Sequence, residues 1–190
     1  MTSKKYIIIA VVLFCMAMCS SGQARVLTHG PMIGHTTDTT ARIWVRADGP
    51  CKMQICFFLK GRTLRMIVSE TIRLEEGNNF CGSAEVRGLS PKTTYSYRVF
   101  LDNKEQSRDV RQEITTFGRA LEPGIIRIGF GHSLRGSGAQ DTWKAVAAKK
   151  PDLFILMGDN IYSNSTEPAK QRRMYLQFRA DQYLDRKSVV

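Results

Sequence analysis

The twelve residues PDLFILMGDNIY, at positions 151–162, decide how the second half of the chain folds. The stretch opens with proline, a helix breaker, and runs through apolar residues to a glycine and an aspartate. Because the run is continuously apolar rather than alternating, it is typical of a strand that is covered on both faces. We therefore expect a buried strand that ends at Gly158, with Asp159 and Tyr162 just beyond it.

A second strand and a short helix precede this stretch. IIRIGFG, residues 125–131, is short, apolar and rich in β-branched side chains, which favours a strand. GSGAQDTWKAVAAKK, residues 136–150, indicates a loop and then a short helix with Trp143, Val146 and Ala147 on one face. Strand, helix and strand make one βαβ unit with a right-handed crossover. The loops that follow the two strands should then meet at one edge of the sheet.

The first half of the chain has a different pattern. Residues 25 to about 118 alternate polar and apolar positions in short runs that turn residues separate, which predicts antiparallel strands in a β-sandwich. GLSPKTTYSYRVF, residues 88–100, resembles a strand pair of fibronectin type III or immunoglobulin-like domains. In such domains the hydroxyl of a corner tyrosine bonds back to the chain, a role that either Tyr95 or Tyr97 would take.

The histidines and cysteines of this half offer no recognisable metal site. His29 and His35 lie near Asp38, but no third ligand has a suitable spacing, which favours structural roles for both imidazoles. Three cysteines lie beyond the N-terminal segment, and either one bridge that includes Cys81 or three free thiols would fit their spacing. These cysteines are Cys51, Cys56 and Cys81.

The N-terminal segment has the pattern of a secretory signal. Lys4 and Lys5 precede an apolar run of about a dozen residues, and small residues at Gly22 and Ala24 suit cleavage after Ala24. The run is shorter than the roughly 20 residues that a spanning helix needs, so we expect no stable membrane span after cleavage. We therefore expect an exported protein, with an uncleaved anchor or lipid attachment at Cys19 as alternatives.

Composition indicates a basic globular protein. Of 190 residues, 43% are hydrophobic and 24% are charged, which excludes a disordered chain. Removal of the signal segment leaves 26 basic against 17 acidic side chains, a net charge of about +9. This charge suits anionic substrates, but the arginines and lysines are scattered over both halves, so we expect no specific nucleic-acid binding.

The acid and the phenol after the predicted strand suit a metal site. A carboxylate can bridge hard cations through its two oxygens, and a nearby tyrosine can bind a trivalent metal as phenolate. The alternative is structural: Asp159 would cap the following turn and Tyr162 would pack beneath it.

The same stretch, with Trp143 eight residues before its proline, resembles the opening of a metallophosphoesterase domain, in particular that of alkaline phosphatase D-like enzymes. Those enzymes also carry a preceding β-sandwich, and HGPMIGHTTDTTARIWVRADGP, residues 29–50, resembles its first strand and loop. The resemblance covers nearly all of residues 25–190. It implies a secreted phosphomonoesterase or phosphodiesterase that hydrolyses phosphate esters with a metal-activated hydroxide. It also implies an iron–calcium site in which Asp159 bridges the metals and Tyr162 binds iron, with another divalent metal as the alternative.

The chain departs from this family in two places. Where the family commonly has Phe-Gly-Ser-Cys, this chain has Phe130, Gly131, His132 and Ser133, so a serine stands at the position of the cysteine ligand. A neutral hydroxyl is a poorer iron ligand than a thiolate, and His132 could replace it only if the loop shifted. The second departure is that no histidine follows Asp159, although such sites normally use histidine among their later ligands.

The sequence as a whole predicts a mixed β and α/β fold. We expect a signal peptide at 1–24, a fibronectin- or immunoglobulin-like β-sandwich at 25–119, and an incomplete α/β metallophosphoesterase domain at 120–190. A final helix within 168–184 should pack on the sheet through Met174, Phe178 and Leu184. Two strands and two helices cannot cover both faces of a sheet, so we expect the second half to be less stable than the sandwich.

Two other functions fit parts of the sequence. The chain could be a noncatalytic secreted binding protein whose phosphatase portion is vestigial. A purple acid phosphatase also combines a β-sandwich with this motif, but its first metal aspartate should follow the opening strand, where GFGHSLR has no acid. The sequence leaves the oligomeric state open.

Overall fold

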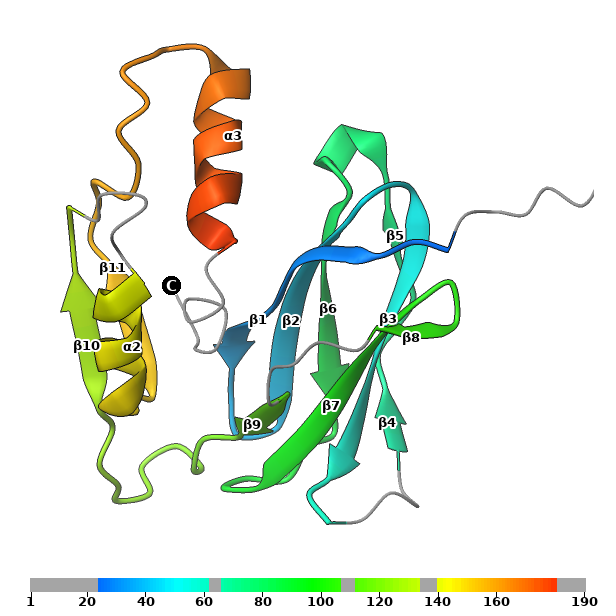
Figure 1. Ribbon diagram of the computed structural model, residues 1–190. Helices are drawn as coiled ribbons and strands as arrows, with labels where there is room; N and C mark the ends of the chain where they lie inside the picture. The colour runs from blue at the N-terminus through cyan, green and yellow to red at the C-terminus, as the bar shows by residue number, and fades with distance from the viewer. Residues whose placement is uncertain (1–23, 62–65, 107–111, 134–139, 181–190) are drawn as a thin grey trace, which may run out of the picture.

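The computed structural model describes residues 24–61, 66–106, 112–133 and 140–180. Within these residues a β-sandwich comes first and a small βαβ unit follows it (Figure 1). The predicted signal segment, apart from Ala24, lies outside the described residues, and so does Leu184. No helix in the described part of the chain is long and apolar enough to cross a membrane.

Two antiparallel sheets form the sandwich, as the alternating pattern predicts. In spatial order, the first sheet contains β1 (Leu27–Thr36), β2 (Thr40–Ala47) and β6 (Cys81–Arg87). The second contains β4 (Met66–Val68), β3 (Cys51–Leu59), β7 (Thr94–Leu101) and β8 (Lys104–Gln106), with β5 (Ile72–Leu74) beside β3 and β9 (Glu113–Thr115) beside β7. A short 3-10 helix, η1 (Glu76–Asn78), leads into β6.

Inward-facing side chains of the two sheets form the main core. Ile43 and Val45 of β2 are fully buried, as are Ile55 and Phe57 of β3, because alternate residues of a strand face the same side. The ring of Phe57 stacks on that of Tyr97 with 5.5 Å between centroids. Eighteen buried residues belong to this cluster, so most of the apolar burial that stabilises the described chain lies in the sandwich.

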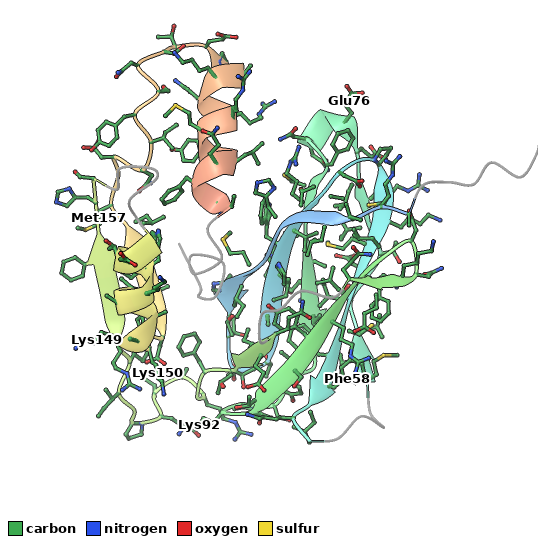
Figure 2. The ribbon with its side chains drawn as sticks, in the orientation of Figure 1. Phe58, Glu76, Lys92, Lys149, Lys150 and Met157 are labelled. Carbon is green, nitrogen blue, oxygen red and sulfur yellow. The ribbon has the colours of Figure 1, made fainter. Side chains whose placement is uncertain are left out.

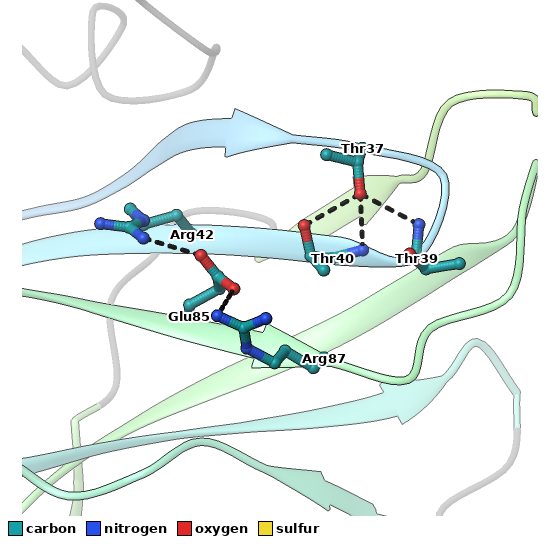
Figure 3. A network of polar contacts seen from close by, with 6 residues as sticks. All are labelled: Thr37, Thr39, Thr40, Arg42, Glu85 and Arg87. Atoms are coloured by element: carbon teal, nitrogen blue, oxygen red, sulfur yellow. Dashed lines mark hydrogen bonds and ion pairs between the residues drawn. The ribbon is translucent and has the colours of Figure 1, made fainter. Parts of the chain in front are cut away.

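Polar contacts fix the turn and the register of the first sheet (Figure 3). The hydroxyl oxygen of Thr37 accepts hydrogen bonds from the backbone nitrogens of Thr39 and Thr40, at 3.1 and 2.9 Å, which closes the turn between β1 and β2. Across β2 and β6, Glu85 pairs with both Arg42 and Arg87 at 2.7 Å. The hydrogen bond from Arg42 lowers the pKa of Glu85 below its usual value.

Tyr95 is the corner tyrosine that the sequence predicts. Its hydroxyl oxygen accepts a hydrogen bond of 2.9 Å from the backbone nitrogen of Ser90, whereas Tyr97 packs its ring in the core. The carbonyl of Ser90 in turn accepts a 2.6 Å hydrogen bond from the Thr116 hydroxyl. The tyrosine hydroxyl therefore ties the segment before β7 to the core.

Removal of this hydroxyl should weaken the sandwich measurably. We expect Tyr95→Phe to lower the free energy of unfolding by about 1 kcal/mol, the usual net contribution of one such hydrogen bond. Ser90→Ala is the matched control, because Ser90 donates through its backbone nitrogen and keeps the bond. Urea unfolding of the two variants measures the difference. Equal midpoints for both would contradict the role that we give to the hydroxyl.

Of the two alternatives for the cysteines beyond the N-terminal segment, the structure has free thiols: among the described residues Cys51, Cys56 and Cys81 are all unbridged. Cys56 is buried, and the other two are half-buried. Burial raises the pKa of each thiol, and burial together with the nearby charge of Asp102 raises that of Cys51 to about 11. These thiols stay protonated at neutral pH.

The second half contains the predicted βαβ unit. Strands β10 (Ile128–Gly131) and β11 (Leu153–Leu156) pair in parallel, and α2 (Gln140–Ala148) connects them. In α2 the predicted face is the less exposed one: Trp143 is buried, Val146 and Ala147 are half-buried, and the lysines are exposed. Helix α3 (Pro168–Arg179) ends the described chain.

A small second core holds this unit together. Phe154 of β11 lies edge-on to Trp143 of α2 with 5.4 Å between ring centroids, and Trp143 meets Phe178 of α3 at 6.1 Å. Gly129 of β10 makes room for Phe154, because a Cβ at this position would lie 2.6 Å from an atom of the ring. Phe178 of α3 packs in this core, as predicted, whereas Met174 is only half-buried.

The expectation that this strand is covered on both faces is wrong within the described residues. Ile155 of β11 is 37% exposed, and its neighbours Ile128 and Phe130 on β10 are 54% and 69% exposed. Both helices contribute to the core around Phe154, so they cover the same face of the sheet. The opposite face remains open, as two strands and two helices require. Figure 2 shows Met157 at the end of β11 in this unit.

Helix α3 also contacts the sandwich, which the sequence does not predict. The backbone carbonyl of Leu176 lies 3.1 Å from Nε2 of His29 on β1, while Nδ1 of the same ring meets the Thr28 hydroxyl at 3.1 Å. His29 therefore has the structural role that we expected, as a link between the two halves.

Candidate functional site

The loops after β10 and β11 meet at the carboxyl edge of the parallel pair, as expected. The nitrogen of Met157 donates a 2.9 Å hydrogen bond to the carbonyl of Gly131, and the nitrogen of Ser133 donates one of 3.3 Å to the carbonyl of Gly158. Through these hydrogen bonds, the parallel pairing of β10 and β11 continues beyond the last residue of each strand. This brings together two segments that lie 26 residues apart in the chain.

Four side chains from these loops form a continuous polar cluster. The hydroxyls of Ser133 and Tyr162 both donate to Oδ2 of Asp159, at 3.4 and 3.3 Å. Nδ1 of His132 lies 2.7 Å from the Ser133 hydroxyl. All four residues that the sequence singles out are therefore brought together, and they are exposed to solvent. The long distances to Asp159 leave its carboxylate only weakly held by its neighbours.

The backbone of both loops adopts left-handed conformations at this cluster. Ser133 has a φ of 59° and Asp159 a φ of 50°, a region that costs most residues with a side chain about 1–2 kcal/mol. Gly158 has a φ of 111°, which requires glycine even though a Cβ there would meet no atom within 4 Å. Residues in such strained backbone conformations cluster at active sites and ligand-binding sites.

Asn160 is a residue that our sequence interpretation missed. Its side-chain oxygen Oδ1 is buried and has no hydrogen-bond partner among the described residues. Beside it, Ile161 packs against the small core and anchors the loop. A buried acceptor without a partner is costly, so a cation or donor that reached this oxygen would be stabilising.

The cluster fits one hard cation with an incomplete set of ligands. A carboxylate, a phenol, a hydroxyl and an imidazole are the donors at hand, and oxygen and imidazole donors suit iron. In the described residues, no group of three or more histidine, cysteine, aspartate and glutamate side chains could hold a metal. Calcium takes six to eight oxygen ligands, so this cluster alone does not fit an iron–calcium pair.

A family model described as a domain of unknown function (DUF7800) matches residues 24–118. The chain belongs to the DUF7800 family. The match to DUF7800 spans the β-sandwich and ends before the βαβ unit, so it does not include the polar cluster around Asp159.

Solved structures extend the likeness beyond the DUF7800 region. A structure of PhoD superposes with a TM-score of 0.66 at 17% identity, over 85% of this chain and 37% of that one. The chain thus has a PhoD-like fold and spans just over a third of the length of PhoD. The sensor domain of the anti-sigma factor RsgI4 from Pseudobacteroides cellulosolvens aligns at 18% identity and a TM-score of 0.40, over 54% of this chain and 97% of its own. No curated protein matches the chain.

Proposed function

We propose that the chain supplies the β-sandwich and one metal-binding edge of an exported phosphate-ester hydrolase of the alkaline phosphatase D type. The observation that carries the proposal is the convergence of the Ser133 and Tyr162 hydroxyls on one carboxylate oxygen of Asp159. The PhoD-like fold supports it, since PhoD is alkaline phosphatase D. The substrate would be a phosphomonoester or phosphodiester, in keeping with the basic charge of the chain.

In this proposal Asp159 and Tyr162 would hold an iron ion, Tyr162 as phenolate. A bound cation supplies two effects at such a site: it lowers the pKa of water and neutralises charge on a phosphoryl group. Ser133 orients the Asp159 carboxylate through its hydroxyl, and His132 orients Ser133. Calcium would need oxygen ligands beyond this cluster.

Export is part of the same proposal and depends on the signal segment at 1–24. We also propose that a domain boundary lies between residues 119 and 120. The sandwich then positions the βαβ unit through α3. We rank a purple acid phosphatase lower, because the residues that follow β10 are His132 and Ser133 and not an acid.

A noncatalytic secreted binding protein is the second candidate. The observation that favours it is that Asp159 is the one carboxylate in the described polar cluster. Hydrolysis of a phosphodiester probe by the full chain, with and without chelator, separates the two candidates. Chelator-sensitive turnover, or metal binding at Asp159 and Tyr162 without turnover, would support a metal-binding edge of a hydrolase, whereas the absence of both turnover and metal binding would support the second candidate.

Tyr162 provides a direct test of metal binding. When ferric iron is added to the chain, we expect a visible tyrosinate-to-iron absorption band that Tyr162→Phe abolishes. Tyr175→Phe is the matched control, because the two tyrosines are 42% and 40% exposed. A band that survives in Tyr162→Phe, or no band in the unaltered chain, would refute the role of Tyr162.

A further inference from the structure

A crevice lies between α3 and the sandwich, away from the polar cluster. It has a volume of about 290 Å³, at the lower end of the range for small-molecule sites. Helix α3 forms one wall, and β2, β6 and the η1 turn form the other. The lining residues that matter here are Trp44, Asn78, Asn79, Cys81, Arg172 and Arg179.

One face of α3 builds its wall of the crevice. Arg172, Leu176 and Arg179 are spaced by four and three residues, so they share a face of the helix, whereas Phe178 points into the small core. The His29 contact to the Leu176 carbonyl holds this face against β1. The crevice is therefore a product of the docking of α3 on the sandwich.

Arg179 is held in place by neutral groups. Its guanidinium lies over the Trp44 ring, 5.6 Å from the centroid, and its Nη1 is 3.1 Å from the sulfur of Met32. Neither contact neutralises its charge. Among the described residues no ion pair involves Arg172, Arg179 or Arg46.

The positive charges converge on one point of the crevice, the thiol of Cys81. Burial raises the pKa of Cys81, while Arg46, Arg179 and Arg172 all act to lower it, and no carboxylate of the described residues contributes. Nε of Arg46 is buried and has no hydrogen-bond partner in the described chain. Three arginines thus act on the same half-buried position, with no counter-charge among the described residues.

The η1 turn adds a neutral donor to this wall. The side-chain oxygen of Asn78 accepts a 3.0 Å hydrogen bond from the backbone nitrogen of Glu75, which leaves the amide group of Asn78 to donate. Glu76 marks the tip of the turn in Figure 2 and does not line the crevice. The wall is therefore rich in donors and poor in acceptors.

We propose that this crevice binds a small phosphate-bearing anion through the guanidinium groups of Arg172 and Arg179. Guanidinium presents planar, paired donors that match phosphate oxygens, and the cluster around Asp159 takes no part. The proposal therefore does not depend on the hydrolase function, and either can fail alone.

Calorimetric titration of the full chain with inorganic phosphate tests the proposal. Chelator should be present, and chloride should keep the ionic strength constant. We expect saturable binding of one phosphate per chain, at least about tenfold weaker in Arg172→Gln/Arg179→Gln. Lys170→Gln/Arg173→Gln is the charge-matched control, since both side chains are exposed on the same helix and neither lines the crevice. Equal losses in both variants, or no saturable binding, would overturn the proposal.

A second measurement needs no variant, which matters because Arg179 also helps to dock α3. Phosphate should slow alkylation of Cys81 in the unaltered chain and leave that of Cys51, the other half-buried thiol, unchanged. Equal slowing at both thiols, or none at Cys81, would contradict binding in the crevice.

Glycerol phosphate distinguishes the source of the anion: tighter binding than inorganic phosphate assigns the site to phosphorylated small molecules, and equal binding assigns it to free phosphate.

Discussion

Phe154→Ala is expected to unfold the βαβ unit and leave the sandwich folded. Removal of a buried phenylalanine costs about 3–5 kcal/mol, because apolar contacts are lost and a cavity remains. The described core of this unit has only three buried residues, Trp143, Phe154 and Phe178, against eighteen in the sandwich. The loss therefore removes most of what holds the unit together. Hydrogen exchange should show loss of protection in β10, α2 and β11, with β2, β3 and β7 unaffected.

Phe130→Ala is the control for this result. Phe130 belongs to the same two-stranded sheet, but its side chain is 69% exposed on the open face. We expect its replacement to change the free energy of unfolding by about 0.5 kcal/mol or less. Equal loss of protection in the two variants would show that the open face is covered, contrary to the structure.

Asp159→Asn should reduce affinity for ferric iron by at least about 100-fold. Loss of a group that only orients a metal ligand typically costs 10–100-fold, and Asp159 would be a direct ligand. Asparagine has nearly the same shape and tolerates the φ of 50° at this position, so the fold should be retained. Iron titration under competition with a chelator measures the change.

Asp141→Asn removes the same charge from a carboxylate outside the cluster. The carboxylate of Asp141 lies on α2 with its side chain 94% exposed and pairs with Lys144. Iron affinity should stay within about twofold in this variant, since exposed charges are screened by salt. A similar loss in both aspartate variants would mean that net charge, and not coordination, governs iron binding.

Local patterns predict much of the fold. Alternation in the first half and the stretch GLSPKTTYSYRVF are local signals, which predict the observed sandwich and a corner tyrosine at Tyr95 or Tyr97. The contact of His29 with Leu176 joins residues 147 apart and has no local signature. The apolar run in β11 wrongly predicted a strand covered on both faces, whereas the presence of only two strands and two helices predicted the open face that the structure has.

The candidate site follows from the same logic. Parallel strands place their carboxyl ends together, which predicts that His132 and Ser133 lie beside Asp159, as the structure has them. The positive φ of Ser133 and the buried oxygen of Asn160 were not predicted. Neither a positive φ at a serine nor the burial of one side-chain oxygen has a residue pattern that the sequence would reveal.

Anomalous diffraction from crystals of the chain grown with ferric iron tests the central claim most directly. The account predicts an iron peak within coordination distance of both the Asp159 carboxylate and the Tyr162 phenolate oxygen. Tyr162 would then have exchanged its 3.3 Å hydrogen bond to Asp159 for a bond to the metal. An ordered cluster with no iron peak, or iron bound only elsewhere on the chain, would contradict the claim.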